Sequence, residues 1–357
     1  MKRAPLALLL ASLLVLAVTW VMAGSRKTGE RPGAELNEDV AVGEPATFDN
    51  LTVFPVTSRR QIDVGPMTTL DAALAKGQAE VSELQGSGPR VNQLQIENKG
   101  DKSIYVLAGT IVKGGNQDRQ IAQDFVIEPK KVVSVDAFCV EHGRWTAERD
   151  GKDTGGKFGA LAQLAPSEVR AAAQYEKDQS QVWALVGATN RVHGKSPPSS
   201  TLMATVDDPE IVKERAALAD RVNRALGKTK PANSVVGLAY AVDGKVRGVR
   251  WFASHAVFEL VRPTLANTAA ADALTAKAAH PADRLASAPM ATASQKDVSD
   301  FIKEAEAQAV SEERDTAGAN RNEYRESAKA HASRTMMKAR AAGAASAVPI
   351  SADVLAK

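Results

Sequence analysis

The stretch SVVGLAYAVDGKVRGVRWF, residues 234–252, carries the clearest secondary-structure signal in the chain. Two apolar, strand-like runs flank Asp243-Gly244, the residue pair that a type I′ hairpin turn prefers. The stretch therefore predicts a β-hairpin, in which two strands pair in antiparallel fashion. A short helix over residues 254–261 is expected next, before Pro263.

Upstream of the hairpin, strand-like and helix-like segments follow one another. Apolar alternation predicts strands near residues 48–56, 91–97, 104–112, 119–127 and 132–141. Helical spacing and capping residues predict helices over residues 68–85, 166–185 and 208–227. We therefore expect one α+β domain over residues 47–268, with a mainly antiparallel sheet and flanking helices.

The N-terminus, MKRAPLALLLASLLVLAVTWVMAGS, has the features of a targeting segment. Lys2 and Arg3 precede an apolar run over residues 4–23, and a small-residue cleavage site ends at Ala23. The run also reaches the roughly 20 residues that a membrane span needs. Residues 1–23 are therefore interpreted as a signal peptide or a signal anchor. Either interpretation predicts an exported protein, periplasmic or in the cell envelope, that meets the membrane only through this segment.

Two further segments lie outside the predicted domain. Residues 24–46 are rich in Gly, Pro and Glu and have no periodicity, which is typical of a linker. Residues 269–357 are rich in alanine and contain few large apolar residues. Because their apolar faces are thin, we expect a helical or disordered C-terminal tail, which could contact a protein partner.

Composition excludes several classes of function. The 357 residues are 44% hydrophobic, which is enough for a real core. A net charge of +3 and only 4% aromatic residues give no case for nucleic-acid binding. The chain has five histidines without metal-motif spacing and one cysteine. P-loop, GxSxG and Rossmann fingerprints are also missing from the sequence, so we expect no metal and no cofactor.

The segment GTIVKGGNQDRQIAQDF, residues 109–125, interrupts a strand-like pattern with polar residues. Successive side chains of a strand point to opposite faces, so Arg119 shares a face with Ile121 and Phe125 and points inward. On the following strand, Cys139 and Glu141 share the inward face. Antiparallel pairing would bring Arg119 and Glu141 together. We predict that they meet or share a ligand, since each is costly to bury alone.

Two interpretations of these polar residues remain open. In the structural interpretation, they form a buried ion pair surrounded by amide hydrogen bonds. In the functional interpretation, they form a pocket at one end of the sheet, in which Arg119 holds a phosphate or carboxylate in bidentate fashion. The remaining substrate-binding residues would then be Gly114 and Gly115, through backbone N–H groups, and Asn116 and Gln117, which would orient the ligand.

The stretch FCVEHGRW, residues 138–145, adds candidates for chemistry. Glu141 is the candidate general acid/base, because burial would raise its pKa towards the working range. Cys139 is a candidate nucleophile with His142 as its base, although the two point to opposite faces of a regular strand; the alternative is a small buried apolar residue. Arg144 and Trp145 could close the pocket by stacking, or be a surface arginine and a core tryptophan.

Several motifs occur in the order found in a known family. The stretches LTVFPV, TLDAAL, GTIVKGGNQDR, FCVEHGRW and VVGLAYAVDGKVRGVRWFASHAVFELV make residues 48–268 resemble the ARG and Rhodanese-Phosphatase-superfamily-associated Protein domain. The positions that match the shared motifs are Gly114, Gly115, Gln117, Arg119, Cys139, Glu141, Arg144 and Trp145.

The resemblance implies a metabolic setting rather than a reaction. The family is named for its association with ADP-ribosylglycohydrolase and rhodanese-like phosphatase genes, which points to NAD or ADP-ribose metabolism. One hypothesis is therefore an exported protein that binds or processes a phosphorylated or nucleotide-like small molecule around Arg119 and Glu141. The alternative is a non-catalytic envelope interaction module in which the polar residues serve only the fold.

Overall fold

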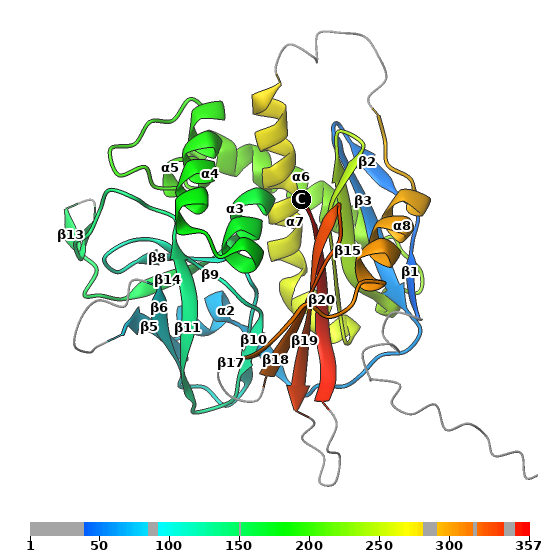
Figure 1. Ribbon diagram of the computed structural model, residues 1–357, viewed down its shortest axis with the longest axis horizontal. Helices are drawn as coiled ribbons and strands as arrows, with labels where there is room; N and C mark the ends of the chain where they lie inside the picture. Colours follow the sequence, from blue (N-terminus) through cyan, green and yellow to red (C-terminus); the bar gives the residue numbers. More distant parts are fainter. Residues whose placement is uncertain (1–38, 85–91, 150, 281–290, 317–319, 339–346) are drawn as a thin grey trace, which may run out of the picture.

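The computed structural model describes residues 39–84, 92–149, 151–280, 291–316, 320–338 and 347–357. The predicted signal segment, residues 1–23, and most of the predicted linker lie outside this range. The described chain forms two lobes that lie side by side (Figure 1). The barrel lobe spans residues 67–206, and the sheet lobe contains residues 40–58 together with the described residues from 209 onward. The α+β class with mainly antiparallel sheets is confirmed.

The barrel lobe is built on a six-stranded antiparallel sheet that curls back on itself. Its order is β14 (Phe158–Leu164), β8 (Thr110–Gly114), β9 (Arg119–Ile121), β11 (Val132–Cys139), β6 (Gln93–Asn98) and β5 (Ala79–Glu83). A bridge between Ser82 and Lys157 joins the two edges. Alternate side chains such as Leu94, Ile96 and Ile121 fill the interior, as strand periodicity requires.

Smaller elements complete the barrel lobe. A three-stranded sheet has the order β10 (Phe125–Ile127), β7 (Ser103–Val106) and β4 (Met67–Thr69), and β12 (Glu148–Arg149) pairs with β13 (Lys152–Asp153). The helices are α2 (Leu70–Ala75), α3 (Ser167–Ala171), the π-helix η1 (Ala172–Glu176), α4 (Gln179–Val192) and α5 (Met203–Val206). The helices α3 to α5 share a core with β8 and β11.

The sheet lobe is a nine-stranded antiparallel sheet with helices on both faces. Its order is β1 (Val40–Val42), β3 (Leu51–Ser58), β15 (Val235–Val242), β16 (Lys245–Phe252), β20 (Ala347–Ala356), β19 (Ala330–Lys338), β18 (Asn320–Glu326) and β17 (Glu312–Thr316), with β2 (Ala46–Phe48) on β3. The helices α6 (Pro209–Leu226) and α7 (His255–Ala279) cover one face, and α8 (Gln295–Glu306) covers the other. A short 3₁₀ turn, η2 (Ala232–Ser234), precedes β15.

The strongest local predictions are confirmed. Asp243 and Gly244 both have positive φ, 51° and 75°, as a type I′ turn between β15 and β16 requires. Asp208 caps α6 by accepting from the backbone N–H groups of Glu210 and Ile211. Pro209 occupies the first turn of α6, where no intrahelical N–H bond is lost. Turn and cap chemistry therefore determined these elements from neighbouring residues alone.

Three predicted helices have clearly different bounds. The helix expected over residues 68–85 is only α2, and Val81 lies in strand β5. The helix expected over residues 166–185 breaks at Lys177, whose φ is 57°. Conversely, α7 continues through Pro263 to residue 279, because its apolar face is buried in the core of the sheet lobe and compensates for the lost hydrogen bond.

The strand predicted over residues 119–127 is two strands, β9 and β10. They separate at Asp124, whose carboxylate accepts from the backbone N–H of Ala108 and lies 3.4 Å from the Nη1 atom of Arg250. A buried carboxylate is costly without partners, so the strand is interrupted where Asp124 reaches them.

The expectation of a C-terminal tail outside the core is wrong for the described residues. The strand β20 pairs with β16 of the central hairpin, with Val354 opposite Val249. Ala332 and Ala352 are 1% exposed and pack under α8. Alanine suits this close approach of helix and sheet, which the thin apolar pattern did not reveal. The linker prediction also extends too far, since residues 40–42 form strand β1.

A buried polar interface, here called the interlobe seam, joins the two lobes. It consists of Tyr105, Asp124, Arg250, Ser351 and Asp353. The Tyr105 hydroxyl donates to Ser351 Oγ at 2.7 Å, and Arg250 Nη2 donates to Asp353 Oδ2 at 2.7 Å.

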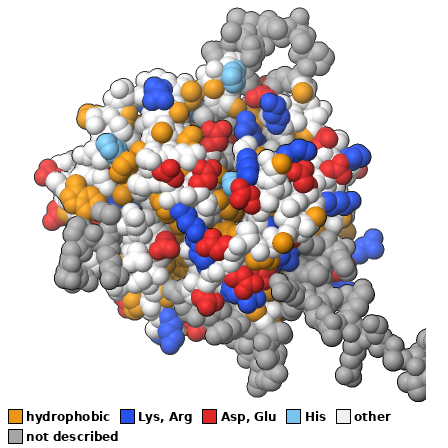
Figure 2. Space-filling model, in the orientation of Figure 1, with side chains coloured by type: hydrophobic (Ala, Val, Ile, Leu, Met, Phe, Trp, Pro, Cys, Tyr) orange, Lys and Arg blue, Asp and Glu red, His pale blue; other side chains and the backbone are white. Residues whose placement is uncertain are grey.

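On the face in Figure 2, basic and acidic side chains are interspersed. Among the described helices, none is long and apolar enough to cross a membrane.

Candidate functional site

The predicted polar residues form one compact group at the end of the barrel sheet. This group, here called the charged cluster, consists of Glu83, Asp118, Arg119, Glu141, Arg144 and Arg149. The strands β9 and β11 are antiparallel, as predicted, and their register places Cys139 opposite Arg119. Glu141 lies beyond the end of β11, so the two predicted partners are not directly opposite each other.

Arg119 is fully buried and does not pair with Glu141. Its Nη2 atom lies 3.6 Å from Glu83 Oε1, and its Nη1 donates to the backbone oxygen of Gln117 at 2.9 Å. The Trp145 ring centroid is 5.6 Å from its Cζ atom, within the range of a cation–π contact. Among the described residues, no ion pair joins Arg119 to Glu141. The prediction of a direct contact between these two side chains is therefore wrong, and its alternative, a shared ligand, stays a prediction.

Glu141 and Asp118 are instead saturated by other groups. Glu141 Oε2 lies 2.8 Å from Arg144 Nη2 and accepts from the Asp118 backbone N–H at 3.1 Å. The Asp118 carboxylate pairs with Arg149 and accepts from Gly114 N–H at 3.0 Å. Thr201 Oγ1 donates to it at 2.9 Å. Both carboxylates are thus paired and hydrogen-bonded, as buried charges must be.

The N–H groups predicted to hold an anion also have partners within the chain. Gly115 N–H donates to Lys157 O at 3.0 Å, and Asn116 N–H donates to Glu83 Oε1 at 3.1 Å. Gly115 has φ 47°, and a Cβ there would collide with the Phe158 ring, so only glycine fits this turn. These contacts favour the structural interpretation of the Gly-Gly segment. The substrate-binding roles assigned to it stay predictions.

The remaining predicted residues lie around the cluster. Gln117 Nε2 donates to His142 O at 3.2 Å, and Trp145 is 43% exposed. Cys139 is 3% exposed, and burial raises the pKa of its thiol, which disfavours the thiolate that a nucleophile needs. The His142 ring packs against Trp183 with centroids 4.4 Å apart. The geometry therefore supports a small buried residue at Cys139 rather than a nucleophile.

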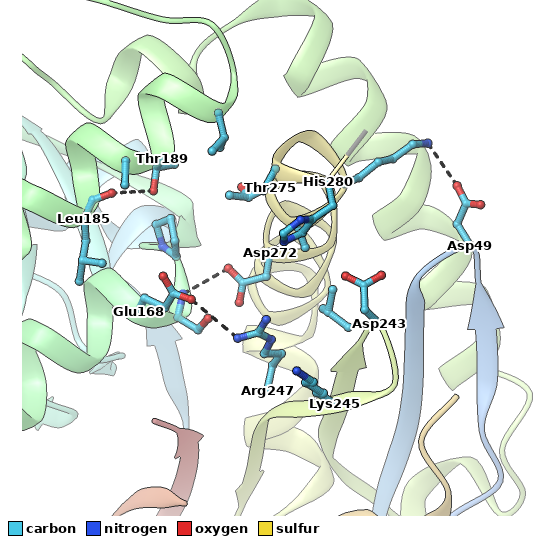
Figure 3. Close-up of a pocket in the computed structure, with 18 of the residues that line it drawn as sticks. Asp49, Glu168, Leu185, Thr189, Asp243, Lys245, Arg247, Asp272, Thr275 and His280 are labelled. Atoms are coloured by element: carbon cyan, nitrogen blue, oxygen red, sulfur yellow. Dashed lines mark hydrogen bonds and ion pairs between the residues drawn. The ribbon is translucent and has the colours of Figure 1, made fainter. Parts of the chain in front are cut away.

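A separate cavity lies between the two lobes. This interlobe cavity has a volume of about 770 Å³ and is bounded by α4, the start of α3, the C-terminal half of α7 and the β15–β16 hairpin. Leu185, Val192 and Val242 give it apolar walls, and polar side chains from α7 and β16 point into it (Figure 3). Small-molecule sites combine apolar walls with convergent polar groups, and this cavity has both, with a larger polar share than is usual.

Asp272 is the buried acid of the interlobe cavity. It is 8% exposed, its Oδ2 accepts from the Tyr240 hydroxyl at 2.6 Å, and its Oδ1 accepts from Ser167 N–H at 3.2 Å. Burial raises the pKa of Asp272 above its ordinary value, and the Tyr240 hydrogen bond opposes that change. A carboxyl group with a raised pKa that lines a cavity is a recognised sign of a functional site.

Basic side chains line the rim of the same cavity. Arg247 Nη1 lies 3.7 Å from Glu168 Oε1, and Lys277 Nζ lies 3.2 Å from Asp49 Oδ2. Lys245 is exposed, and within the described residues its ammonium group has no ion pair or hydrogen bond. The cavity thus contains both a cation with free hydrogen-bonding capacity, which suits an anion, and a buried acid, which suits a hydroxyl group.

Sequence reasoning missed this cavity. Asp272 fell in the alanine-rich region assigned to the tail, and Lys245 was part of a hairpin without an assigned role. The available signal was an acidic residue inside an otherwise apolar helical stretch, AAADAL, residues 269–274. Among the described residues, no group of three or more His, Cys, Asp or Glu is placed to hold a metal ion.

Comparison with known proteins gives a single match. No curated protein and no solved structure matches the chain. One family model matches residues 39–347, which include both lobes, the charged cluster and the interlobe cavity. This range is wider than the 48–268 suggested by the motifs, and it takes in the β17–β19 strands. The chain therefore belongs to the ARG and Rhodanese-Phosphatase-superfamily-associated Protein domain family.

Proposed function

We propose that the protein binds a phosphorylated, nucleotide-like small molecule in the interlobe cavity. The observation that carries this proposal is that a buried acid, Asp272, and an unpaired cation, Lys245, line the same cavity of about 770 Å³. That volume lies within the range of roughly 300–1,000 Å³ that small-molecule sites occupy. The position differs from the one expected around Arg119 and Glu141, because the charged cluster is occupied by its own ion pairs.

The two ends of the cavity suit different parts of such a ligand. Lys245 and Arg247 would receive the phosphate, because an ammonium and a guanidinium form charge-assisted hydrogen bonds with it. Asp272 would contact ligand hydroxyl groups, since each of its oxygens has a lone pair beyond the one used by Ser167 or Tyr240. The association in the family's name with ADP-ribosylglycohydrolases supports the same ligand class.

Export remains part of the proposal. It is supported by the basic start and apolar run of residues 1–23.

The alternative of a non-catalytic interaction module is favoured by one observation, the fully paired carboxylates of the charged cluster. That observation concerns the cluster alone and leaves the interlobe cavity without an explanation.

A ligand screen tests the proposal. The purified full-length protein is tested by thermal unfolding and calorimetry against ADP-ribose, nucleotides and sugar phosphates, with the unphosphorylated nucleosides and sugars beside them. We expect at least one phosphorylated compound to raise the Tm, because a ligand that binds only the folded state stabilises it. The Lys245→Met variant should weaken that compound's binding about tenfold or more.

The matched control is Lys213→Met, on the exposed side of α6 and away from the cavity. It should bind the compound as the unaltered protein does. The proposal fails if no phosphorylated compound changes the Tm, or if the two lysine variants bind equally well.

A further inference from the structure

A second, much smaller cavity lies in the interior behind Asp272. It has a volume of about 20 Å³, and its polar wall is formed by Arg170, Tyr240, Arg250 and Asp353. Tyr240 connects it to the interlobe cavity, since the Tyr240 hydroxyl donates to Asp272 Oδ2 at 2.6 Å. A volume of this size holds one water molecule and nothing larger.

Arg170 is the unusual residue at this cavity. It is 3% exposed, yet within the described residues its guanidinium has neither an ion pair nor a hydrogen bond. Gly109 makes room for its stem, because a Cβ there would lie 2.6 Å from Arg170 Cδ. A buried guanidinium with unused donors is costly, so a hydrogen-bond acceptor is expected beside it.

Arg250 faces the same cavity with an unused donor of its own. Its Nη2 donates to Asp353 Oδ2 at 2.7 Å and its Nη1 lies 3.4 Å from Asp124 Oδ1, but its Nε atom has no partner among the described residues. Acceptors line the cavity as well. The Tyr240 oxygen is free to accept because its proton goes to Asp272, and Asp353 is a carboxylate with several acceptor positions.

We propose that one ordered water molecule binds in this small cavity, accepting from Arg170 and Arg250 and donating to Tyr240 and Asp353. Two donors and two acceptors around one small volume match the hydrogen-bonding capacity of water. A halide of similar size fits less well, because Asp353 lines the cavity and would repel it. Arg250 is attracted to Asp124 and Asp353, and Arg170 is attracted to Asp353 and Asp272, so both guanidinium groups already have carboxylates near them.

The water would complete a continuous hydrogen-bonded path. The path runs from Asp272 through Tyr240 to the water, and from there to Asp353 and Arg250 in the interlobe seam. It would link the carboxyl group of the interlobe cavity to the contact that holds the two lobes together. The water site itself does not depend on whether the interlobe cavity binds a ligand.

Crystallography of the full chain tests the site directly. We expect one density peak within hydrogen-bonding distance of both guanidinium groups, without anomalous signal after a bromide soak. A bromide peak at this position would overturn the proposal. So would a structure in which Arg170 pairs directly with a carboxylate and no density lies between the two arginines.

A variant that fills the cavity gives a second test. The Cβ of Gly248→Ala would lie 3.0 Å from the Tyr240 ring, at the wall of the small cavity, and should displace the water. We expect the density peak to disappear and the Tm to fall by roughly 2–4 °C. The control is Gly159→Ala, whose Cβ has no heavy atom within 4 Å and should change neither.

Unchanged density in Gly248→Ala would contradict the proposal. Should that variant fail to fold, Arg170→Met replaces it, since it removes a donor while keeping the stem's volume. Its crystal structure should then lack the peak, and a peak that persists with unchanged contacts would count against the site.

Discussion

The charged cluster and the interlobe cavity are both rich in polar side chains, but they differ in how these are satisfied. In the charged cluster, Glu141 and Asp118 are held by arginines and backbone N–H groups and are at most 2% exposed. In the interlobe cavity, Asp272 and Lys245 keep unused hydrogen-bonding capacity beside a volume of about 770 Å³. Unused capacity beside open volume indicates a ligand site better than a dense polar motif does.

The largest effect is expected from Glu141→Gln in the charged cluster. We expect a loss of about 3–5 kcal/mol in the free energy of unfolding, because Arg144 loses the buried counter-charge at 2.8 Å and keeps only that of Asp118, at 3.6 Å. Denaturant unfolding measures the loss, and ligand affinity of the folded fraction should be unchanged. Glu214→Gln, at an exposed position of α6, is the control and should cost less than about 1 kcal/mol. Near-normal stability with lost ligand binding would instead indicate that the ligand binds at the charged cluster.

A smaller effect is expected from Asp272→Asn in the interlobe cavity, and it should appear in ligand affinity. Ligand affinity should fall about 10- to 100-fold, because a hydrogen bond to a charged group is lost. Calorimetry with the compound found in the screen measures the change. Asp220→Asn, on an exposed position of α6, is the matched control and should bind normally. Equal affinities for the two variants would exclude Asp272 as a ligand contact.

The Asp272→Asn variant should also differ from the unaltered protein in the pH dependence of its stability, and this effect should be smaller. Burial raises the pKa of Asp272 above 3.8, so the folded state keeps its proton to a higher pH than the unfolded state does. Its contribution to stability therefore falls as pH rises from 3.8 to the folded-state pKa, and is constant above that. The Asp272→Asn variant lacks this loss. Its stability relative to the unaltered protein should improve over that pH interval, as measured by denaturant unfolding at several pH values, and a constant difference would contradict the prediction.

The smallest effect is expected at Cys139. Because the thiol is buried and its pKa is raised, alkylation of the native protein at pH 8 should be much slower than in denaturant. Cys139→Ala should leave ligand binding unchanged and cost only about 1 kcal/mol of stability. Mass spectrometry follows the labelling. Rapid alkylation of the folded chain would restore Cys139 as a candidate nucleophile.

The sequence predicted the parts of the candidate site that depend on strand geometry. Alternation placed Arg119, Cys139 and Glu141 on an inward face, and all three are buried. It did not identify Glu83 as the partner of Arg119, because Glu83 lies on a strand that was predicted to be part of a helix. The family motifs could be recognised because the residues of each motif are contiguous in the chain.

What the sequence determined by itself was local: the type I′ turn at Asp243-Gly244, the Asp208 cap of α6, and the inward face of β11. These depend on backbone conformation and on neighbours a few residues away. Only the tertiary structure decided which polar groups are satisfied. Asp272 receives hydrogen bonds from residues 32 and 105 positions away, and Tyr105 contacts a residue 246 positions away. Whether a buried charge is paired or free to bind a ligand depends on such distant contacts, which no local pattern encodes.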